Sequence, residues 1–173
     1  MSESGPASRA GALHEAVNAW PPAEARATLL RCCGSGRWVD AMLARRPFAS
    51  TEALLTAAEV AWAGLQRADH LEAFSHHPAI GARGAYGFSA EEQAQVLQSA
   101  LTGGDTQRAL ATLNAAYQQR FGFVFLICAT GKSAEEILAE LRLRIDNPPE
   151  TELYIAAGEQ AKITRLRLEK LVP

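Results

Sequence analysis

The sequence has few cysteines, few aromatic residues and little net charge. Its 173 residues include three cysteines, Cys32, Cys33 and Cys128. An odd number with two adjacent members does not suit a disulfide framework, and no two of them have the spacing of about two to four residues that structural zinc sites use. We therefore expect reduced thiols with a structural role, and no metal site.

The sequence also lacks a long hydrophobic run. It has no stretch of about eighteen apolar residues, so a transmembrane helix is not expected. The first residues do not have the layout of a secretory signal. A net charge of −2 gives no basic surface for nucleic acid or for a membrane. These absences predict a cytoplasmic protein that has neither nucleic acid nor a membrane as a partner.

Aromatic residues make up only 7% of the chain, and valine and isoleucine are sparse beside alanine and leucine. That composition favours helices over strands. The length is enough for one domain with its own hydrophobic core. We expect residues 1–12 to form a mobile tail, and residues 13–173 to form a single compact all-α domain of several helices.

Capping residues mark several expected helix ends. Ser89 precedes Glu92 by three residues, and Ser133 precedes Glu136 in the same way, so both pairs are predicted capping boxes. The other expected boundaries are a start at Ser50 or Thr51, a helix from the prolines at 21–22 to Gly34, a stop at Pro47, a helix from Asp105 or Thr106 to Gly122, and a last helix over 149–172.

The run FVFLICAT, residues 123–130, is the exception to the helical pattern. Its β-branched and aromatic residues predict a strand, but no other segment resembles a strand that it can join. We therefore expect either an extended, buried segment or absorption into a helix. An extended buried backbone needs hydrogen-bond partners, and a polar ligand can supply them.

Two adjacent histidines, His76 and His77, lie in a predicted loop between helices. Pro78 biases the backbone of His77 to an extended conformation, and Ile80 and Gly81 supply an apolar anchor and a bend. This arrangement can hold the His77 imidazole rigidly, whereas His76 is expected to be a solvated loop residue. A metal site is disfavoured, because adjacent side chains diverge and no HExxH or CxxC pattern is present.

Other polar residues have two interpretations each. The helix start at Ser89–Gln93 is a plain cap or an anion site, because its N–H groups and dipole attract carboxylates. Arg120 is a surface charge or a carboxylate clamp. Arg165 and Arg167 point to different faces of the last predicted helix; a solvated position is the usual interpretation, and the other is that one of them faces inward. A pocket of His, Glu and Arg suits acid–base chemistry on a small anionic substrate.

Several motifs occur together and in a fixed order. They are CCGSGRWVDAMLARRPF, LEAFSHHP, HPAIGARG, SAEEQ, YQQRFGFVFLICATGKSAEEIL, RLRIDNPPETEL and KITRLRL. In this combination the sequence resembles the 2-oxo-4-hydroxy-4-carboxy-5-ureidoimidazoline (OHCU) decarboxylases, over roughly residues 13–171. Each motif alone is a modest signal, and their joint order and spacing are specific.

The resemblance implies an all-α homodimer that removes CO2 from OHCU to give S-(+)-allantoin, the last step of urate breakdown. It implies no cofactor. The catalytic histidine that it implies is His77, to which we assign the role of general acid, and we expect Glu92, from the substrate-binding run that it implies, to be catalytic as well. The substrate-binding residues that it implies are Pro78, Ser89, Ala90, Glu91, Gln93, Phe125, Leu126, Ile127, Cys128, Ala129 and Arg167.

Two alternatives from other classes stay open on the sequence. One is a helical binding module that keeps the fold without catalysis. The other is a hydrolase that acts on a related ureide or on hydroxyisourate, with water as the nucleophile. The presence of His77, Glu92 and Gln93 argues against a catalytically dead relative.

Overall fold

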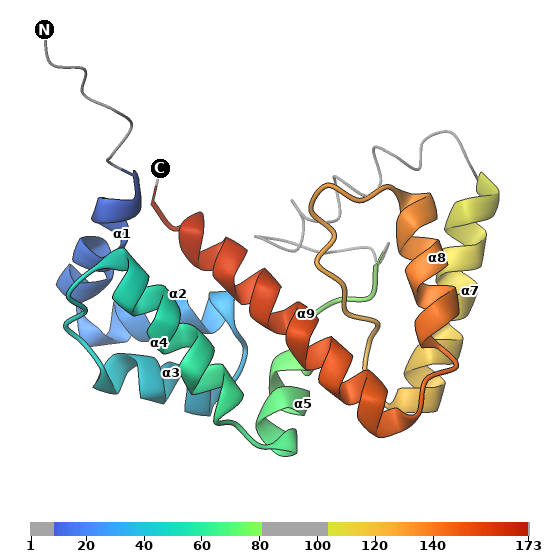
Figure 1. Cartoon of the computed structure of the whole chain (residues 1–173), viewed down its shortest axis with the longest axis horizontal. Helices are drawn as coiled ribbons and strands as arrows, with labels where there is room; N and C mark the ends of the chain where they lie inside the picture. Colours follow the sequence, from blue (N-terminus) through green and yellow to red (C-terminus); the bar gives the residue numbers. More distant parts are fainter. Residues whose placement is uncertain (1–8, 81–103, 173) are drawn as a thin grey trace, which may run out of the picture. The chain divides into compact units, whose positions relative to one another are not determined.

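The computed structural model describes residues 9–80 and 104–172, with side chains from residue 13 onward. This part of the chain contains eight helices and no strand (Figure 1), which confirms the prediction of an all-α fold. In the same residues, no helix is both long and apolar enough to cross a membrane. The helices are α1 (Arg9–Ala19), α2 (Pro22–Cys32), α3 (Gly36–Ala44), α4 (Thr51–Ala63), α5 (Arg67–Ser75), α7 (Gly104–Phe121), α8 (Ala134–Arg144) and α9 (Pro149–Glu169).

The chain divides into two compact units. Unit 1 comprises Met1–Glu72 and Ala161–Pro173, and unit 2 comprises Ala73–Gln160. Helices α5 and α9 therefore contribute residues to both units. The single domain over 13–173 stays a prediction. Helix α1 begins at Arg9, inside the stretch that the sequence assigns to the tail, and residues 1–8 lie outside the described part.

Polar caps and a proline begin the helices of unit 1. Pro22 is the first residue of α2, where the missing N–H leaves no intrahelical bond unmade. The Ser50 hydroxyl accepts from the Ala53 N–H at 3.0 Å, which confirms the predicted start of α4. The Ser35 hydroxyl caps α3 in the same way by accepting from the Trp38 N–H at 3.3 Å. Helix α3 ends at Ala44, before the expected stop at the proline.

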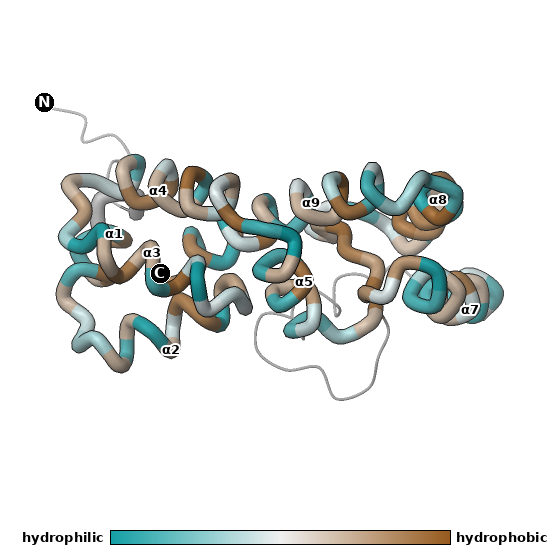
Figure 2. Tube along the Cα trace, turned by 90° about the horizontal axis from the view of Figure 1, so that it is seen from below, coloured by the Kyte–Doolittle hydropathy of each residue, from teal (hydrophilic) through white to brown (hydrophobic). Residues whose placement is uncertain are grey.

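The core of unit 1 is apolar and helical. Helix α1 packs against α4, and α3 packs against both α2 and α4. Apolar and polar residues are mixed along α4 and α9 in Figure 2, as expected for helices with one buried and one exposed face. Fully buried side chains include Val17, Leu29, Cys32, Trp38, Val39, Met42 and Leu54.

Unit 2 is built around the pair α7 and α8, which pack against each other. Gly122 has a φ of +80° and ends α7 as predicted, because glycine adopts this left-handed conformation without strain. The predicted capping box of α8 is confirmed. The Ser133 N–H donates to Glu136 Oε2 at 2.7 Å, and the Glu136 N–H donates to Ser133 Oγ at 3.1 Å.

The segment between α7 and α8 is not absorbed into a helix. Residues 124–129 belong to neither helix nor strand, and Figure 1 shows the connection between α7 and α8 as an irregular coil. Phe123, Phe125, Leu126 and Ile127 are buried, so the alternative of a buried non-helical segment is confirmed. Tyr117 packs against two of its rings edge-on, Phe123 at 5.8 Å and Phe125 at 5.2 Å between centroids. These contacts fix the segment in the core of unit 2.

Candidate functional site

His77 lies in a tight turn directly after α5. The His77 N–H donates to the Phe74 carbonyl at 3.1 Å, so the turn continues from the last residues of the helix. His77 is half-buried, whereas His76 is exposed. The ring Nε2 of His77 lies 2.6 Å from Oε1 of Gln160 on α9. The structure therefore separates the two histidines: one is fixed by a hydrogen bond to a side chain, and the other lies on the surface.

Helix α9 also holds the backbone of the segment 123–130. Glu159, next to Gln160, accepts a hydrogen bond from the Cys128 N–H at 2.7 Å through Oε2. Gln160 is completely buried, and Glu159 is half-buried. Two successive residues of one helix thus connect the histidine turn and the apolar segment. Both contacts lie within unit 2.

A buried ionic cluster fixes the other part of this segment. Arg144 Nη1 donates to the Leu126 carbonyl at 2.8 Å, and its guanidinium lies 4.5 Å from the centre of the Phe125 ring. Arg144 also donates to Glu152 Oε1 through Nε at 2.8 Å and Nη2 at 2.6 Å. The exposed fractions of the two side chains are 6% and 0%. Arg144 therefore combines a buried ion pair with a backbone contact.

Glu152 has further donors in this cluster. The Tyr117 hydroxyl donates to Oε1 at 2.5 Å, and the Asn147 amide donates to Oε2 at 3.0 Å. Burial raises the pKa of the Tyr117 hydroxyl well above its usual range, and the Glu152 carboxylate raises it further. The hydroxyl stays protonated at neutral pH, so it remains a donor to Glu152. Such a fully bonded cluster makes the backbone of the apolar segment rigid.

The two late arginines of α9 have different surroundings. Arg167 is buried, with 6% exposure, and its Nη1 donates to the Arg31 carbonyl at 3.4 Å. Arg165 is exposed and pairs with Glu59 at 2.9 Å and with Glu169 at 3.1 Å. The prediction that these arginines lie on different faces is confirmed, and Arg167 is the inward one.

The remaining predicted site residues are placed only in part. Ser89, Ala90, Glu91, Glu92 and Gln93 lie outside the described residues. Pro78 is half-buried beside His77, as are Cys128 and Ala129 in the apolar segment. Arg120 is exposed, stacks on Phe121 and donates to the Asn147 carbonyl at 3.3 Å. Arg120 is therefore a surface charge, one of its two interpretations.

Two of the three cysteines, Cys32 and Cys33, are buried and are not activated as nucleophiles. None of the three forms a disulfide. Burial raises the pKa of Cys32 to about 12 and that of Cys33 to about 11, although the nearby Arg167 charge lowers both. These two thiols stay protonated at neutral pH. Among the described residues, no three His, Cys, Asp or Glu side chains come together so that they can hold a metal ion.

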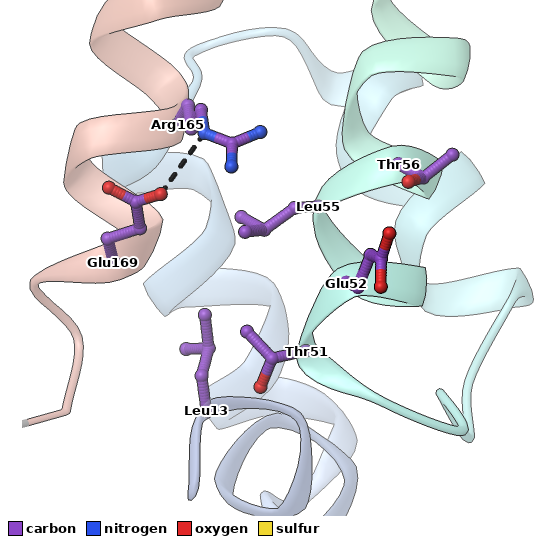
Figure 3. Close-up of a pocket in the computed structure, with 7 residues that line it drawn as sticks. All are labelled: Leu13, Thr51, Glu52, Leu55, Thr56, Arg165 and Glu169. Atoms are coloured by element: carbon purple, nitrogen blue, oxygen red, sulfur yellow. Dashed lines mark hydrogen bonds and ion pairs between the residues drawn. The ribbon is translucent and has the colours of Figure 1, made fainter. Parts of the chain in front are cut away.

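A cavity of about 550 Å³ lies in unit 1 (Figure 3). Arg165, which lines this cavity, is already paired with two carboxylates, those of Glu59 and Glu169. Figure 3 shows Leu55 projecting between this arginine and α4. Among the described residues, none of those that line the cavity is a histidine; they are Leu13, Thr51, Glu52, Leu55, Thr56, Arg165 and Glu169. We do not assign the chemistry to it.

Sequence reasoning missed four side chains that position the candidate site. Arg144, Glu152, Glu159 and Gln160 lie in helical runs rich in charged residues, which are typical of solvated faces. The sequence NPPE between α8 and α9 is a weak indication of the ion pair. The last turn of α8 is basic and the first turn of α9 is acidic, and the short connection keeps the two turns close together. No periodic pattern indicates the contact of Gln160 with His77.

Comparisons with known proteins identify the family of this chain. Residues 18–169 match the family model described as OHCU decarboxylase. The uric acid degradation bifunctional protein TTL of Arabidopsis thaliana is 39% identical over 145 residues, 81% of this chain and 45% of that protein. The 2-oxo-4-hydroxy-4-carboxy-5-ureidoimidazoline decarboxylase of Amia calva is 43% identical over 81 residues, 47% of this chain and 46% of that protein. The chain spans less than half the length of these curated relatives.

A solved structure extends the match to three dimensions. It is a crystal structure of OHCU decarboxylase in the presence of (S)-allantoin, with a TM-score of 0.72 and 40% sequence identity. The match covers 82% of this chain and 94% of that chain. The resemblance read from the motifs is thereby confirmed, and the chain belongs to the OHCU decarboxylase family.

Proposed function

We propose that this protein decarboxylates OHCU to (S)-allantoin and CO2, as a carboxy-lyase of urate breakdown. The observation that carries the proposal is the position of His77, a half-buried imidazole fixed at 2.6 Å from a fully buried amide. A rigid imidazole beside a helix is suited to proton transfer at neutral pH. The family and the related structure with (S)-allantoin supply the substrate class.

The proposed reaction needs little from the protein beyond positioning and one proton. OHCU carries a carboxylate on a ring carbon that also bears an oxygen. When the bond to CO2 breaks, its electron pair stays on the ring, where the neighbouring imine and carbonyl absorb it. The substrate thus serves as its own electron sink, which is consistent with the expected absence of a cofactor. The enzyme holds the carboxylate out of the ring plane and protonates one face.

We assign the protonation to His77. Loss of CO2 leaves its electron pair as a double bond between the two ring carbons, and the imine nitrogen takes up a proton. The His77 imidazolium then gives a proton to the ring carbon that bears the ureido group and becomes neutral, while the hydroxyl on the other carbon loses its proton and becomes the carbonyl of allantoin. Delivery from one side makes a single enantiomer. Glu92 accepts hydrogen bonds from substrate N–H groups and so holds the substrate in position for His77, and Gln93 offers both a donor and an acceptor.

Backbone groups of Phe125–Ala129 read the edge of the flat ring in this proposal. The structure supports it through the rigidity of the segment, since Arg144 binds the Leu126 carbonyl and Glu159 binds the Cys128 N–H. We therefore assign the substrate to peptide groups of this segment that these two side chains do not hold.

The remaining proposed contacts come from three other places. Pro78 and the helix start over Ser89, Ala90 and Glu91 complete the substrate-binding set. Arg167 pairs with a carboxylate or carbonyl oxygen of the substrate, since a guanidinium can bind such groups through two parallel N–H bonds. The burial of Arg167 supports a role other than that of a surface charge.

We further propose that the protein is a cytoplasmic homodimer. Leu143 and Tyr154 in unit 2 are 71% and 82% exposed, and large apolar side chains of this kind are enriched at protein interfaces. Analytical ultracentrifugation tests the assembly state. A sedimentation coefficient of two chains supports the proposal, and a monomer at micromolar concentration contradicts it.

The experiment for the activity uses the two histidines as a matched pair. Freshly prepared OHCU is mixed with the wild-type protein, with His77→Ala and with His76→Ala, and its decay is followed by absorbance. We expect His77→Ala to lose the enzymatic rate by about 100-fold or more, and His76→Ala to stay within about twofold. The opposite pattern, with activity lost only in His76→Ala, contradicts the assignment of His77.

A further inference from the structure

The hydrogen bond between His77 and Gln160 has a defined donor and a defined acceptor. His77 Nε2 lies 2.6 Å from Gln160 Oε1, an oxygen that only accepts hydrogen bonds. We propose that Gln160 is a positioning residue for His77: its amide oxygen accepts the Nε2–H, which makes Nδ1 the nitrogen that gives the proton to the substrate. This inference rests on the proposed decarboxylase function and names the atom that performs its last step.

A neutral imidazole carries one ring proton, on either nitrogen, and the partner of one nitrogen decides between the two forms. An acceptor at Nε2 favours the form with hydrogen on Nε2 and a lone pair on Nδ1. Protonation then occurs at Nδ1. In the reaction the Nδ1–H bond breaks, the carbanion-like ring carbon forms the C–H bond, and the remaining proton stays on Nε2 against Gln160. Both protonation states of the histidine keep the same hydrogen bond.

The surroundings of Gln160 suit this role. Its side chain is completely buried, so its orientation is fixed by packing and not by solvent. The preceding residue, Glu159, holds the Cys128 N–H at 2.7 Å. Helix α9 thus fixes the imidazole and the backbone of the apolar segment from adjacent positions.

An amide also suits the chemistry better than a carboxylate at this position. A carboxylate next to Nε2 stabilises the imidazolium by its charge and makes it a weaker acid. A neutral amide oxygen fixes the ring orientation with a smaller effect of this kind. Gln160 therefore fixes the orientation of the His77 ring and lowers the acidity of its imidazolium less than a carboxylate does.

The test is nitrogen NMR of the full-length protein labelled with ¹⁵N-histidine. The chain has four histidines, and the His77 signals are assigned by their absence in His77→Ala. At a pH where the ring is neutral, we expect the proton on Nε2 in the wild type. In Gln160→Met, which keeps the length of the side chain and removes the acceptor, we expect loss of this preference. We expect kcat for OHCU to fall by roughly tenfold to a hundredfold, with KM within about twofold.

Two further variants control for folding and burial. Asn114→Leu also replaces a buried amide of unit 2 by an apolar group, and we expect it to leave the His77 spectrum and kcat unchanged. Gln160→Glu restores an acceptor, and we expect it to keep the proton on Nε2. This second variant carries the test if Gln160→Met does not fold, as judged by its thermal unfolding.

The outcomes separate the two proposals. A wild-type spectrum with the proton on Nδ1 overturns the inference, because Gln160 then donates to His77. An active wild type whose Gln160→Met variant keeps both the Nε2–H form and full kcat overturns the role of Gln160 alone. A wild type that does not accelerate the decay of OHCU overturns the proposed function, and the catalytic role of Gln160 with it, whatever the spectrum shows.

Discussion

Among the described residues, exposed ion pairs occur in both units, but the fully buried pair lies in unit 2. In unit 1, Arg165 and its partner Glu59 are both about half exposed, at 49% and 57%. In unit 2, Arg144 and Glu152 are almost completely buried, at 6% and 0%. Unit 2 contains a buried segment, residues 124–129, that forms no regular structure. Such a backbone needs other partners, and Arg144 is one of them, through the Leu126 carbonyl.

The buried pair is therefore expected to matter more for stability than the exposed one. A buried charge loses its hydration and depends on its partner, whereas an exposed charge is screened by water and salt. The difference links stability to function in unit 2. The residues that stabilise the apolar segment also fix the backbone to which we assign the substrate.

The largest expected effect is that of Arg144→Met. It leaves Glu152 buried without its cationic partner, so we expect unfolding to become easier by about 3–5 kcal/mol. Urea denaturation followed by circular dichroism measures this change. A double variant, Arg144→Met with Glu152→Leu, removes the uncompensated charge and is expected to recover part of the loss. A loss below about 1 kcal/mol in the single variant contradicts the importance of the buried pair.

Arg165→Met, the matched change in unit 1, is expected to have a small effect. Its partners Glu59 and Glu169 are solvated, so we expect a loss of less than about 1 kcal/mol, measured in the same denaturation experiment. Added salt should reduce this loss further, since exposed pairs are screened. If Arg165→Met lowered the free energy of unfolding as much as Arg144→Met, the exposed and the buried ion pair would not differ in importance, which contradicts the account.

The smallest expected effect is that of Asn114→Leu. Asn114 is buried in α7, and in the described part of the chain its amide atoms have no hydrogen-bond partner. Replacement by an apolar side chain removes the cost of burying an unsatisfied amide, so we expect stability to stay equal or to rise by up to about 1 kcal/mol. A clear loss in thermal unfolding would indicate that this amide does have a partner in the folded protein.

Local features of the fold could be predicted from the sequence. Ser50, Ser133 and Gly122 act within a few residues of themselves, so their caps and turns can be read from spacing. Helical periodicity also placed the two late arginines on different faces, and the family motif singled out Arg167. His77 was distinguished from His76 by the proline that follows it and by the family motif.

The long-range contacts of the candidate site could not be predicted in this way. His77 and Gln160 are 83 positions apart, and Cys128 and Glu159 are 31 apart. Periodicity shows which face of a helix is apolar, but not which distant segment a polar side chain meets. Arg144 and Glu152 were also missed, because charged residues in a helix usually lie in solvent and only the fold reveals their burial.

The most direct test of the central claim is the handedness of the product. Urate is oxidised and hydrolysed in the presence of the protein, and the circular dichroism of the allantoin formed is recorded. The account predicts pure (S)-allantoin with the wild type and racemic product, at the spontaneous rate, with His77→Ala. Racemic allantoin at the spontaneous rate with the wild type would contradict it and favour a protein that binds without catalysis.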